Sequence, residues 1–268
     1  MFSSLEVSLK KSSCFNKRKQ CFALFIDDSL SEKDAFLKST DMFHFCNDYF
    51  LKKTDYPFVL TLENASSFGG STENISRWKK RGVVMASLTW NFENSLAGGV
   101  KSKKGLTAFG KSAIKEMENE KIVVDVSHLN EKSFSDFLSV SRKPFAASHS
   151  NCYSICKNER NLKDWQIKEI VSSSGIIGLN FYPLFLGNGF VFENIYKNII
   201  YLLKFGAEDN IAIGSDFDGA KMSVFLNSDK KVIHLYNFLR LKGLEKSILE
   251  KIFFKNAENF FNNVLQVK

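Results

Sequence analysis

Short apolar segments alternate with longer amphipathic segments along most of the chain. The longer segments place apolar residues at the three- and four-residue spacing of helices. This alternation predicts successive strand–helix units around a parallel sheet. The predicted strands cover residues 21–26, 58–62, 83–88, 122–126, 145–148, 176–180 and 211–214, and the predicted helices cover 32–52, 72–80, 110–120, 131–141, 163–172 and 192–205.

The number of predicted strands bears on the fold class. The tail from residue 229 onward predicts two or three further helices, so the chain offers seven strand–helix units. A closed parallel barrel needs eight strands. Three explanations stay open at this point: the sheet is open, one unit is absent, or the N-terminal segment SLEVSL, in which Leu5, Val7 and Leu9 alternate with polar residues, acts as a strand.

Nothing in the sequence marks a domain boundary. The 268 residues include only three prolines, no Gly/Ser-rich linker and no internal repeat. A chain of this length is long enough for one large core. We therefore predict a single domain over residues 1–268.

The formal net charge of +8 raises nucleic acid or an acidic membrane surface as partners. The lysines, however, are scattered, mixed with acidic residues along most predicted helices, and not interleaved with aromatic residues as in stacking platforms. We expect a solvated basic surface and no nucleic-acid partner.

The five cysteines, at positions 14, 21, 46, 152 and 156, form no C-x-x-C pair and are odd in number. They indicate neither a disulfide framework nor a cysteine zinc site, and a reducing compartment fits them best.

No apolar run approaches the roughly 18 residues of a membrane span, and the N-terminus lacks the apolar core of a signal peptide. A cytoplasmic protein without a membrane span is predicted.

Ionisable side chains lie just after the ends of several of the predicted strands. In parallel α/β barrels the active site lies where the strands end, so these positions are the candidates for chemistry. They hold Glu63, His128, His149, Asp216 and Asp218.

Glu63, His128 and His149 together suit a divalent metal. Neutral imidazole and carboxylate oxygen are ligands that zinc favours. His128 and His149 are one strand–helix–strand step apart, which predicts adjacent strands. The other two histidines, His44 and His234, lie within predicted helices and are expected to be ordinary surface or partly packed residues.

The segments TLENASSFGG, LTWNFEN, GLTAFGKSAIKEM, VVDVSHLNEKSF, RKPFAASHSN, ERNLKDWQIKEI, GLNFYPLFL and IAIGSDFDG resemble successive blocks of one family. This is the membrane dipeptidase family, the renal dipeptidase-like zinc metallopeptidases of the amidohydrolase superfamily. The resemblance runs from about residue 20 to the C-terminus, with the blocks in the family's order and spacing.

The resemblance implies a TIM-type (β/α)8 barrel that holds two zinc ions and hydrolyses the peptide bond of a dipeptide. Carried over residue by residue, Glu63 matches the carboxylate that bridges the zinc ions, and His128 and His149 match the two histidine ligands of one zinc. Arg160, in ERN, matches the arginine that binds the substrate's C-terminal carboxylate. Asp216 matches the aspartate that orients the bridging water and handles its proton.

Two departures from the family pattern bear on activity. The family's first strand ends in a His-x-Asp pair that supplies the other zinc ligands, and no such pair occurs in this sequence. The chain is thus expected to lack the first strand–helix unit and to hold one zinc ion or none. Trp90 stands where animal members have a histidine, although many bacterial members also have tryptophan there.

The sequence therefore predicts a cytoplasmic zinc dipeptidase, with dipeptides that include those with a D-residue at the second position as candidate substrates. Family members are often dimers, so the resemblance is compatible with a homodimer. Two alternatives remain. The missing His-x-Asp pair favours a non-catalytic homologue or gene fragment that acts, if at all, as a binding protein. The basic charge suggests a metal-dependent phosphoesterase on a similar barrel, but no His-x-His pair is present to support it.

Overall fold

The structure is a computed structural model that describes residues 5–7, 15, 17–49, 58–141 and 143–265. The chain separates into two compact units, which are considered one at a time. The N-terminal unit comprises Lys19–Phe145 with Val264–Lys268, and the C-terminal unit comprises Met1–Arg18 with Ala146–Asn263. The single domain expected from the sequence stays a prediction.

Four parallel strands form the sheet of the N-terminal unit. These are β1 (Gln20–Phe25), β2 (Phe58–Glu63), β3 (Val83–Ser87) and β4 (Val123–Asp125), and each pairs with the next in chain order. The register places Phe25 opposite Glu63 and Ser87 opposite Asp125. The carboxyl ends of the strands are therefore aligned, which brings the residues that follow each strand to one edge of the sheet.

The connections of this unit are α2 (Glu32–Tyr49), η2 (Ala65–Phe68), α3 (Glu73–Lys80), α4 (Ala108–Asn119) and α5 (Glu131–Val140). Two helices begin at side-chain caps: Thr107 accepts from the amide of Gly110, and Asn130 accepts from the amide of Ser133. The fully buried Trp78 and Phe134 belong to the core beneath the helices. Capped, amphipathic helices of this kind cover a sheet with their apolar faces.

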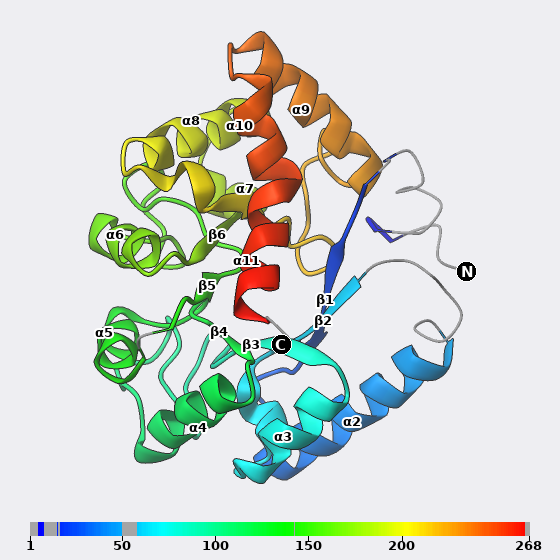
Figure 1. The fold of residues 1–268 in the computed structure, drawn as a ribbon, viewed down its shortest axis with the longest axis vertical. Coiled ribbons are helices and arrows are strands. Elements are labelled where there is room, and N and C mark those ends of the chain that lie inside the picture. Colours follow the sequence, from blue (N-terminus) through cyan, green and yellow to red (C-terminus); the bar gives the residue numbers. More distant parts are fainter. Residues whose placement is uncertain (1–4, 8–14, 16, 50–57, 142, 266–268) are drawn as a thin grey trace. The chain divides into compact units, whose positions relative to one another are not determined.

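The C-terminal unit repeats the same arrangement with three parallel strands. These are β5 (Ala146–Ala147), β6 (Ile176–Leu179) and β7 (Ile211–Ile213), paired in chain order. Their helices are α6 (Asp164–Ser172), α7 (Pro183–Leu186), α8 (Val191–Leu203), α9 (Val232–Leu241), α10 (Lys246–Glu250) and α11 (Asn256–Val264), with short turns η3 (Ala207–Asp209), η4 (Asp229–Lys231) and the π-helical η5 (Lys251–Lys255). Figure 1 labels most of these elements, and the colours run from green at β5 to red at α11.

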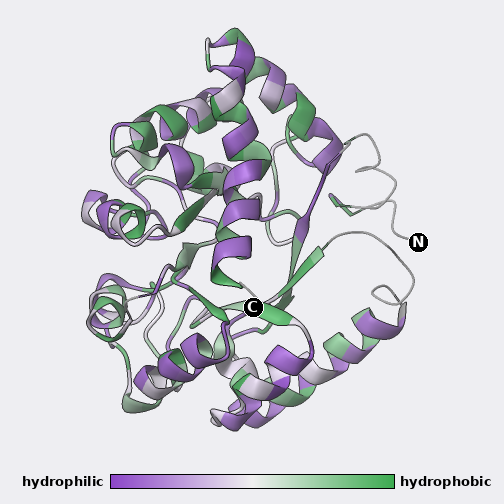
Figure 2. Cartoon of the chain, viewed as in Figure 1, coloured by the Kyte–Doolittle hydropathy of each residue, from purple (hydrophilic) through white to green (hydrophobic). Residues whose placement is uncertain are grey.

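Helix α8 shows why these segments form where they do. Val191, Ile195, Ile199 and Leu202 recur at helical spacing and are all buried. Burial of each side chain of this size contributes about 1.5–3 kcal/mol. Polar residues occupy the other face, so the helices are drawn in both purple and green (Figure 2).

All seven predicted strands and all six predicted helices are present, with ends that differ by a few residues. The result is an α/β fold with parallel strands. The proposed strand at SLEVSL is not supported where it can be assessed, because Leu5–Val7 form a bend. The remaining residues of that segment lie outside the described part of the chain.

Candidate active site

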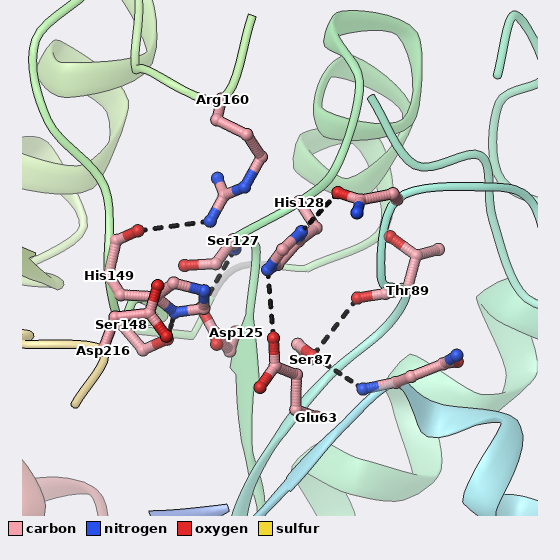
Figure 3. Close-up of polar contacts among 12 residues, drawn as sticks. Glu63, Ser87, Thr89, Asp125, Ser127, His128, Ser148, His149, Arg160 and Asp216 are labelled. Atoms are coloured by element: carbon pink, nitrogen blue, oxygen red, sulfur yellow. Dashed lines mark hydrogen bonds and ion pairs between the residues drawn. The ribbon is translucent and has the colours of Figure 1, made fainter. Parts of the chain in front are cut away.

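In the N-terminal unit, Glu63 and His128 lie side by side. Glu63 is the last residue of β2, and His128 follows β4 after a short turn. The Nε2 atom of His128 is 3.1 Å from Oε1 of Glu63, and the two side chains are 7% and 20% exposed. Figure 3 shows the imidazole and the carboxylate directed at each other. Two of the predicted metal ligands are thus adjacent in a largely buried position.

The backbone of His128 is in the left-handed region, with φ of 71°. Such a conformation is disfavoured for a residue with a side chain and costs on the order of 1–3 kcal/mol. Hydrogen bonds hold it: the amide of Val100 donates to the carbonyl of His128 at 2.8 Å, and the amide of Leu129 donates to Val126 at 3.1 Å. The strain fixes the direction in which the imidazole leaves the chain.

Strained backbone recurs at strand ends in both units. Of the six non-glycine residues with positive φ in the described part of the chain, two, Lys121 and Ser174, follow helices. The other four come after strands: Asn64, His128, Asp216 and Asp218. Strained residues cluster at functional sites, where the fold must aim side chains.

Asn64 joins the strand ends around Glu63. It is fully buried, and its side-chain amide donates to the carbonyl of Ile26 at 3.0 Å and to Oδ1 of Asp28 at 2.9 Å. Its backbone amide donates to Oγ of Ser87 at 3.0 Å. Asn64 therefore links the carboxyl ends of β1, β2 and β3 beside the candidate ligand. Burial raises the pKa of the Asp28 carboxyl that shares this network.

Trp90 lies in the loop after β3 and packs against the same group of residues. Its ring meets that of Phe25 edge-on, with centroids 5.0 Å apart, and lies 6.4 Å from the imidazole of His128. An indole here supplies an apolar wall and one N–H donor rather than a titratable group.

In the C-terminal unit, His149 follows β5 and is half-buried. Its Nδ1 atom lies 2.7 Å from Oγ of Ser148. Its carbonyl oxygen accepts from Nη2 of Arg160 at 3.2 Å and from Nδ2 of Asn180 at 3.4 Å. The side chains of Arg160 and Asn180 are therefore both held by the backbone carbonyl of His149, a predicted ligand.

Arg160 is buried, only 6% exposed, in the loop between β5 and α6. Nη1 is 3.5 Å from Oγ of Ser150, and the guanidinium lies 5.4 Å from the centre of the Phe185 ring. Figure 3 shows the contact of the guanidinium with the carbonyl of His149. A buried guanidinium held against an aromatic ring is oriented rather than freely rotating.

Asp216 follows β7, has φ of 60°, and is half-buried. Its Oδ2 atom accepts from Nδ2 of Asn180 at 3.1 Å. The structure therefore brings His149, Arg160 and Asp216 together through the His149 carbonyl and the Asn180 amide. Asn180 was not predicted from the sequence, although its place directly after β6 matches that of the predicted ionisable residues after their own strands.

The two remaining histidines have no comparable setting. His44 in α2 and His234 in α9 are both exposed. Both are thus surface residues, one of the two settings expected from the sequence. In the described part of the chain, no helix is both long and apolar enough to cross a membrane.

Residues 20–268 match the sequence profile of the membrane dipeptidase family, peptidase family M19. A Klebsiella pneumoniae protein encoded in the pqqA 5' region is 33% identical over 222 residues, which cover 78% of this chain and 82% of that protein.

Solved structures of metallopeptidases share the fold. The structure of dipeptidase AC, a metallopeptidase of family M19, superposes with a TM-score of 0.90 at 21% identity and covers 97% of this chain and 89% of that one. A Rhodobacter sphaeroides metallopeptidase bound to a phosphinate mimic of the dipeptide L-Ala-D-Ala superposes with a TM-score of 0.89 at 20% identity and covers 98% of this chain and 91% of that one.

Proposed function

Because the chain belongs to the membrane dipeptidase family, peptidase family M19, we propose that it hydrolyses dipeptides with the help of a bound zinc ion. The similar Rhodobacter sphaeroides metallopeptidase binds a phosphinate mimic of L-Ala-D-Ala. That ligand supports a dipeptide, including one with a D-residue at the second position, as the substrate.

We assign the zinc ligands as Glu63, His128 and His149. The observation that carries this assignment is the 3.1 Å approach of His128 Nε2 to Glu63 Oε1 in a largely buried position. An unprotonated Nε2 and a carboxylate oxygen both present lone pairs, and a cation between them converts their repulsion into attraction. The donor set of imidazole nitrogen and carboxylate oxygen therefore fits zinc. The 268-residue sequence contains no His-x-Asp pair, so the proposal is for one zinc ion with three ligands from this chain.

Bound zinc would acidify a water molecule and polarise the peptide carbonyl. Asp216 orients the attacking water, takes its proton and passes it to the leaving amine. The side-chain amide of Asn180 donates to Oδ2 of Asp216 at 3.1 Å and holds the carboxylate in position for this proton transfer.

Arg160 binds the C-terminal carboxylate of the substrate. A guanidinium fork donates two parallel hydrogen bonds to a carboxylate. The contacts with the His149 carbonyl and the Phe185 ring fix the plane of the fork. Such a clamp restricts the substrate to short peptides with a free carboxylate, which is the selectivity of a dipeptidase.

The architecture we propose is that of a (β/α)8 barrel to which residues 20–268 contribute seven strand–helix units, so that the family's first unit is not among them. Within the described part of the chain the cysteines are free thiols, which supports a reducing location in the cytoplasm.

One second candidate function has a specific observation in its favour. The absence of a His-x-Asp pair from the sequence favours a non-catalytic homologue that binds dipeptides without cleaving them. Hydrolysis assays separate the two functions.

The test is hydrolysis of L-Ala-D-Ala and L-Ala-L-Ala by the purified zinc-loaded protein, followed by the release of free alanine. We expect turnover that is lost after dialysis against a chelator and restored by zinc. Dipeptides with an amidated C-terminus should be poor substrates, because they lack the carboxylate for Arg160. Binding of dipeptides by a folded, zinc-loaded protein that releases no alanine would establish the non-catalytic function instead.

A further inference from the structure

We propose that Asn91 is a positioning residue for the candidate metal centre: its amide oxygen accepts the Nδ1 proton of His128 and so presents Nε2 unprotonated toward Glu63. The metal-binding part of this inference rests on the proposed function. The hydrogen bond itself is a feature of the N-terminal unit alone.

The imidazole of His128 has different partners at its two nitrogens. Nδ1 is 3.1 Å from Oδ1 of Asn91, and Nε2 is 3.1 Å from Oε1 of Glu63. An amide oxygen can only accept a hydrogen bond, so the contact with Asn91 requires the proton on Nδ1. A neutral imidazole protonated at Nδ1 has its lone pair on Nε2, which is the form that binds a metal.

The backbone around Asn91 is held by hydrogen bonds on both sides. The amide of Lys101 donates to the carbonyl of Asn91 at 2.8 Å, and the amide of Gly99 donates to the carbonyl of Phe92 at 2.9 Å. A β-carbon on Gly99 would lie 2.3 Å from the carbonyl oxygen of Trp90. The loop thus closes around a glycine that has no room for a side chain, and this closure restricts where the Asn91 amide can lie.

The same loop is tied directly to His128. The amide of Val100 donates to the carbonyl of His128 at 2.8 Å, and Gly99 forms an antiparallel bridge with Leu129. The amide of Asn91 and the imidazole of His128 are therefore carried by two segments joined by backbone hydrogen bonds. The backbones that carry these two side chains are thus fixed relative to each other.

Asp28 links the loop to the other candidate ligand. Its Oδ2 atom accepts from the amide of Phe92, next to Asn91, at 2.9 Å. Its Oδ1 atom accepts from the side chain of Asn64, next to Glu63, at 2.9 Å. One carboxylate therefore sets the positions of both the carboxylate ligand and the residue that orients the histidine ligand. Outer-shell contacts of this kind typically change metal affinity by about 10- to 100-fold when they are removed.

Two substitutions at position 91 separate this role from simple loop packing. Asn91→Leu keeps the branched four-atom skeleton of the side chain but has no acceptor, and Asn91→Asp keeps an acceptor and strengthens it. Phe92→Ala is the matched control, because Phe92 lies in the same loop with a side chain that is 55% exposed. Zinc dissociation constants are measured by competition with a chromogenic chelator, and thermal unfolding of the metal-free proteins checks that each variant is folded.

We expect Asn91→Leu to weaken zinc binding by about 10- to 100-fold, while Asn91→Asp and Phe92→Ala stay within about threefold of the wild type. Equal affinities for Asn91→Leu and the wild type would overturn the inference. So would weak binding by Asn91→Asp, because it would mean that the Asn91 side chain donates to His128 rather than accepts. Zinc binding by none of the proteins, wild type included, would instead refute the proposed function.

A second readout needs no variant at position 91. In zinc-loaded protein labelled with ¹⁵N-histidine, only four imidazoles contribute signals, and His128 is assigned from the spectrum of His128→Gln. The Nδ1 proton of His128 should be visible and slow to exchange with water. A rapidly exchanging Nδ1 proton in the wild type would contradict the hydrogen bond to Asn91, even if Asn91→Leu did not fold.

Discussion

Asn180 donates its side-chain amide to the carboxylate of Asp216, with Nδ2 3.1 Å from Oδ2. The same amide group lies 3.4 Å from the carbonyl oxygen of His149, and its own Oδ1 accepts from the amide of Tyr182 at 2.7 Å. A fully buried asparagine thus fixes the proposed proton-transfer group relative to a proposed ligand. In a buried site such a hydrogen bond to a charged group is stronger than its counterpart in water.

Asn180→Ala should lower both stability and turnover. Loss of the amide leaves buried partners without their hydrogen bonds, at a cost of about 1–3 kcal/mol in the free energy of unfolding. Because Asp216 also loses its orientation, we expect kcat for dipeptides to fall by about 10- to 100-fold. Urea unfolding and steady-state kinetics measure the two effects.

The control is Asn194→Ala in α8. Asn194 is also buried and donates to the carbonyls of Gly187 and Asn188 at 3.0 and 3.1 Å, but it does not contact Asp216. A comparable loss of stability with unchanged kcat is expected there. If both variants reduced kcat equally, the effect of Asn180 would be one of general stability.

Gly219→Ala should displace Asp216 from Asn180. A β-carbon at position 219 would lie 2.4 Å from Oδ1 of Asp216 and 3.4 Å from its carbonyl oxygen. The carboxylate must rotate away, so kcat should fall by about 10-fold or more while the free energy of unfolding changes by less than about 1 kcal/mol. Steady-state kinetics and urea unfolding measure the two effects. Unaltered kcat would show that the Asp216 carboxylate can change its orientation without loss of turnover, which contradicts the proposed mechanism.

Arg160→Lys should affect binding of the substrate carboxylate more than the chemical step. Lysine keeps the positive charge but loses the planar fork. We expect KM for L-Ala-D-Ala to rise by about 10-fold or more with a smaller change in kcat, which is the signature of lost ground-state binding. The dipeptide amide, already a poor substrate, should be hydrolysed equally by both proteins. A larger loss with the amide than with the free dipeptide would exclude the proposed role.

Cys152 should make stability fall at alkaline pH. It is 1% exposed, and burial, assisted by the nearby charge of Asp164, raises the pKa of its thiol well above the ordinary 9.0. As the pH rises past that ordinary value, the unfolded chain releases the proton and the folded chain keeps it. Folding therefore loses about 1.4 kcal/mol per pH unit above that point through this one group.

The comparison that isolates this effect is Cys152→Ser, whose hydroxyl does not titrate in the range. Urea unfolding at pH 8, 9 and 10 should give curves of stability against pH that diverge only above pH 9, with the wild type losing more. Parallel curves would mean that the Cys152 thiol ionises in the folded protein as readily as in the unfolded one.

The sequence predicts strands and candidate ligands well here for one physical reason. Buried parallel strands are continuous apolar segments, so an ionisable residue at the end of one or shortly after it, such as Glu63 or Asp216, lies at the edge where the carboxyl ends of strands meet. The starts of some helices can be predicted from capping residues such as Asn130, which precedes α5. The resemblance to the dipeptidase family adds Arg160, which sequence pattern alone would leave as a surface residue.

The residues that hold the ligands in place are harder to predict. Asn64, Asn91 and Asn180 act through hydrogen bonds to partners that are distant in sequence: Asn91 and His128 are 37 residues apart, and Asn180 and Asp216 are 36. Asparagine is common in turns, at helix caps and in buried hydrogen-bond networks, so its presence in a sequence does not indicate which of these settings it occupies. Only the folded backbone distinguishes these roles.

The central claim is that Glu63, His128 and His149 bind zinc, and the most direct measurement is the zinc content of the purified chain after equilibrium dialysis, by elemental mass spectrometry. The wild type and the control His44→Ala, which alters an exposed histidine, should each retain about one zinc ion per chain, and His128→Ala should retain almost none. Zinc retained by His128→Ala at the wild-type level, or a folded wild type that binds no zinc, would contradict the claim.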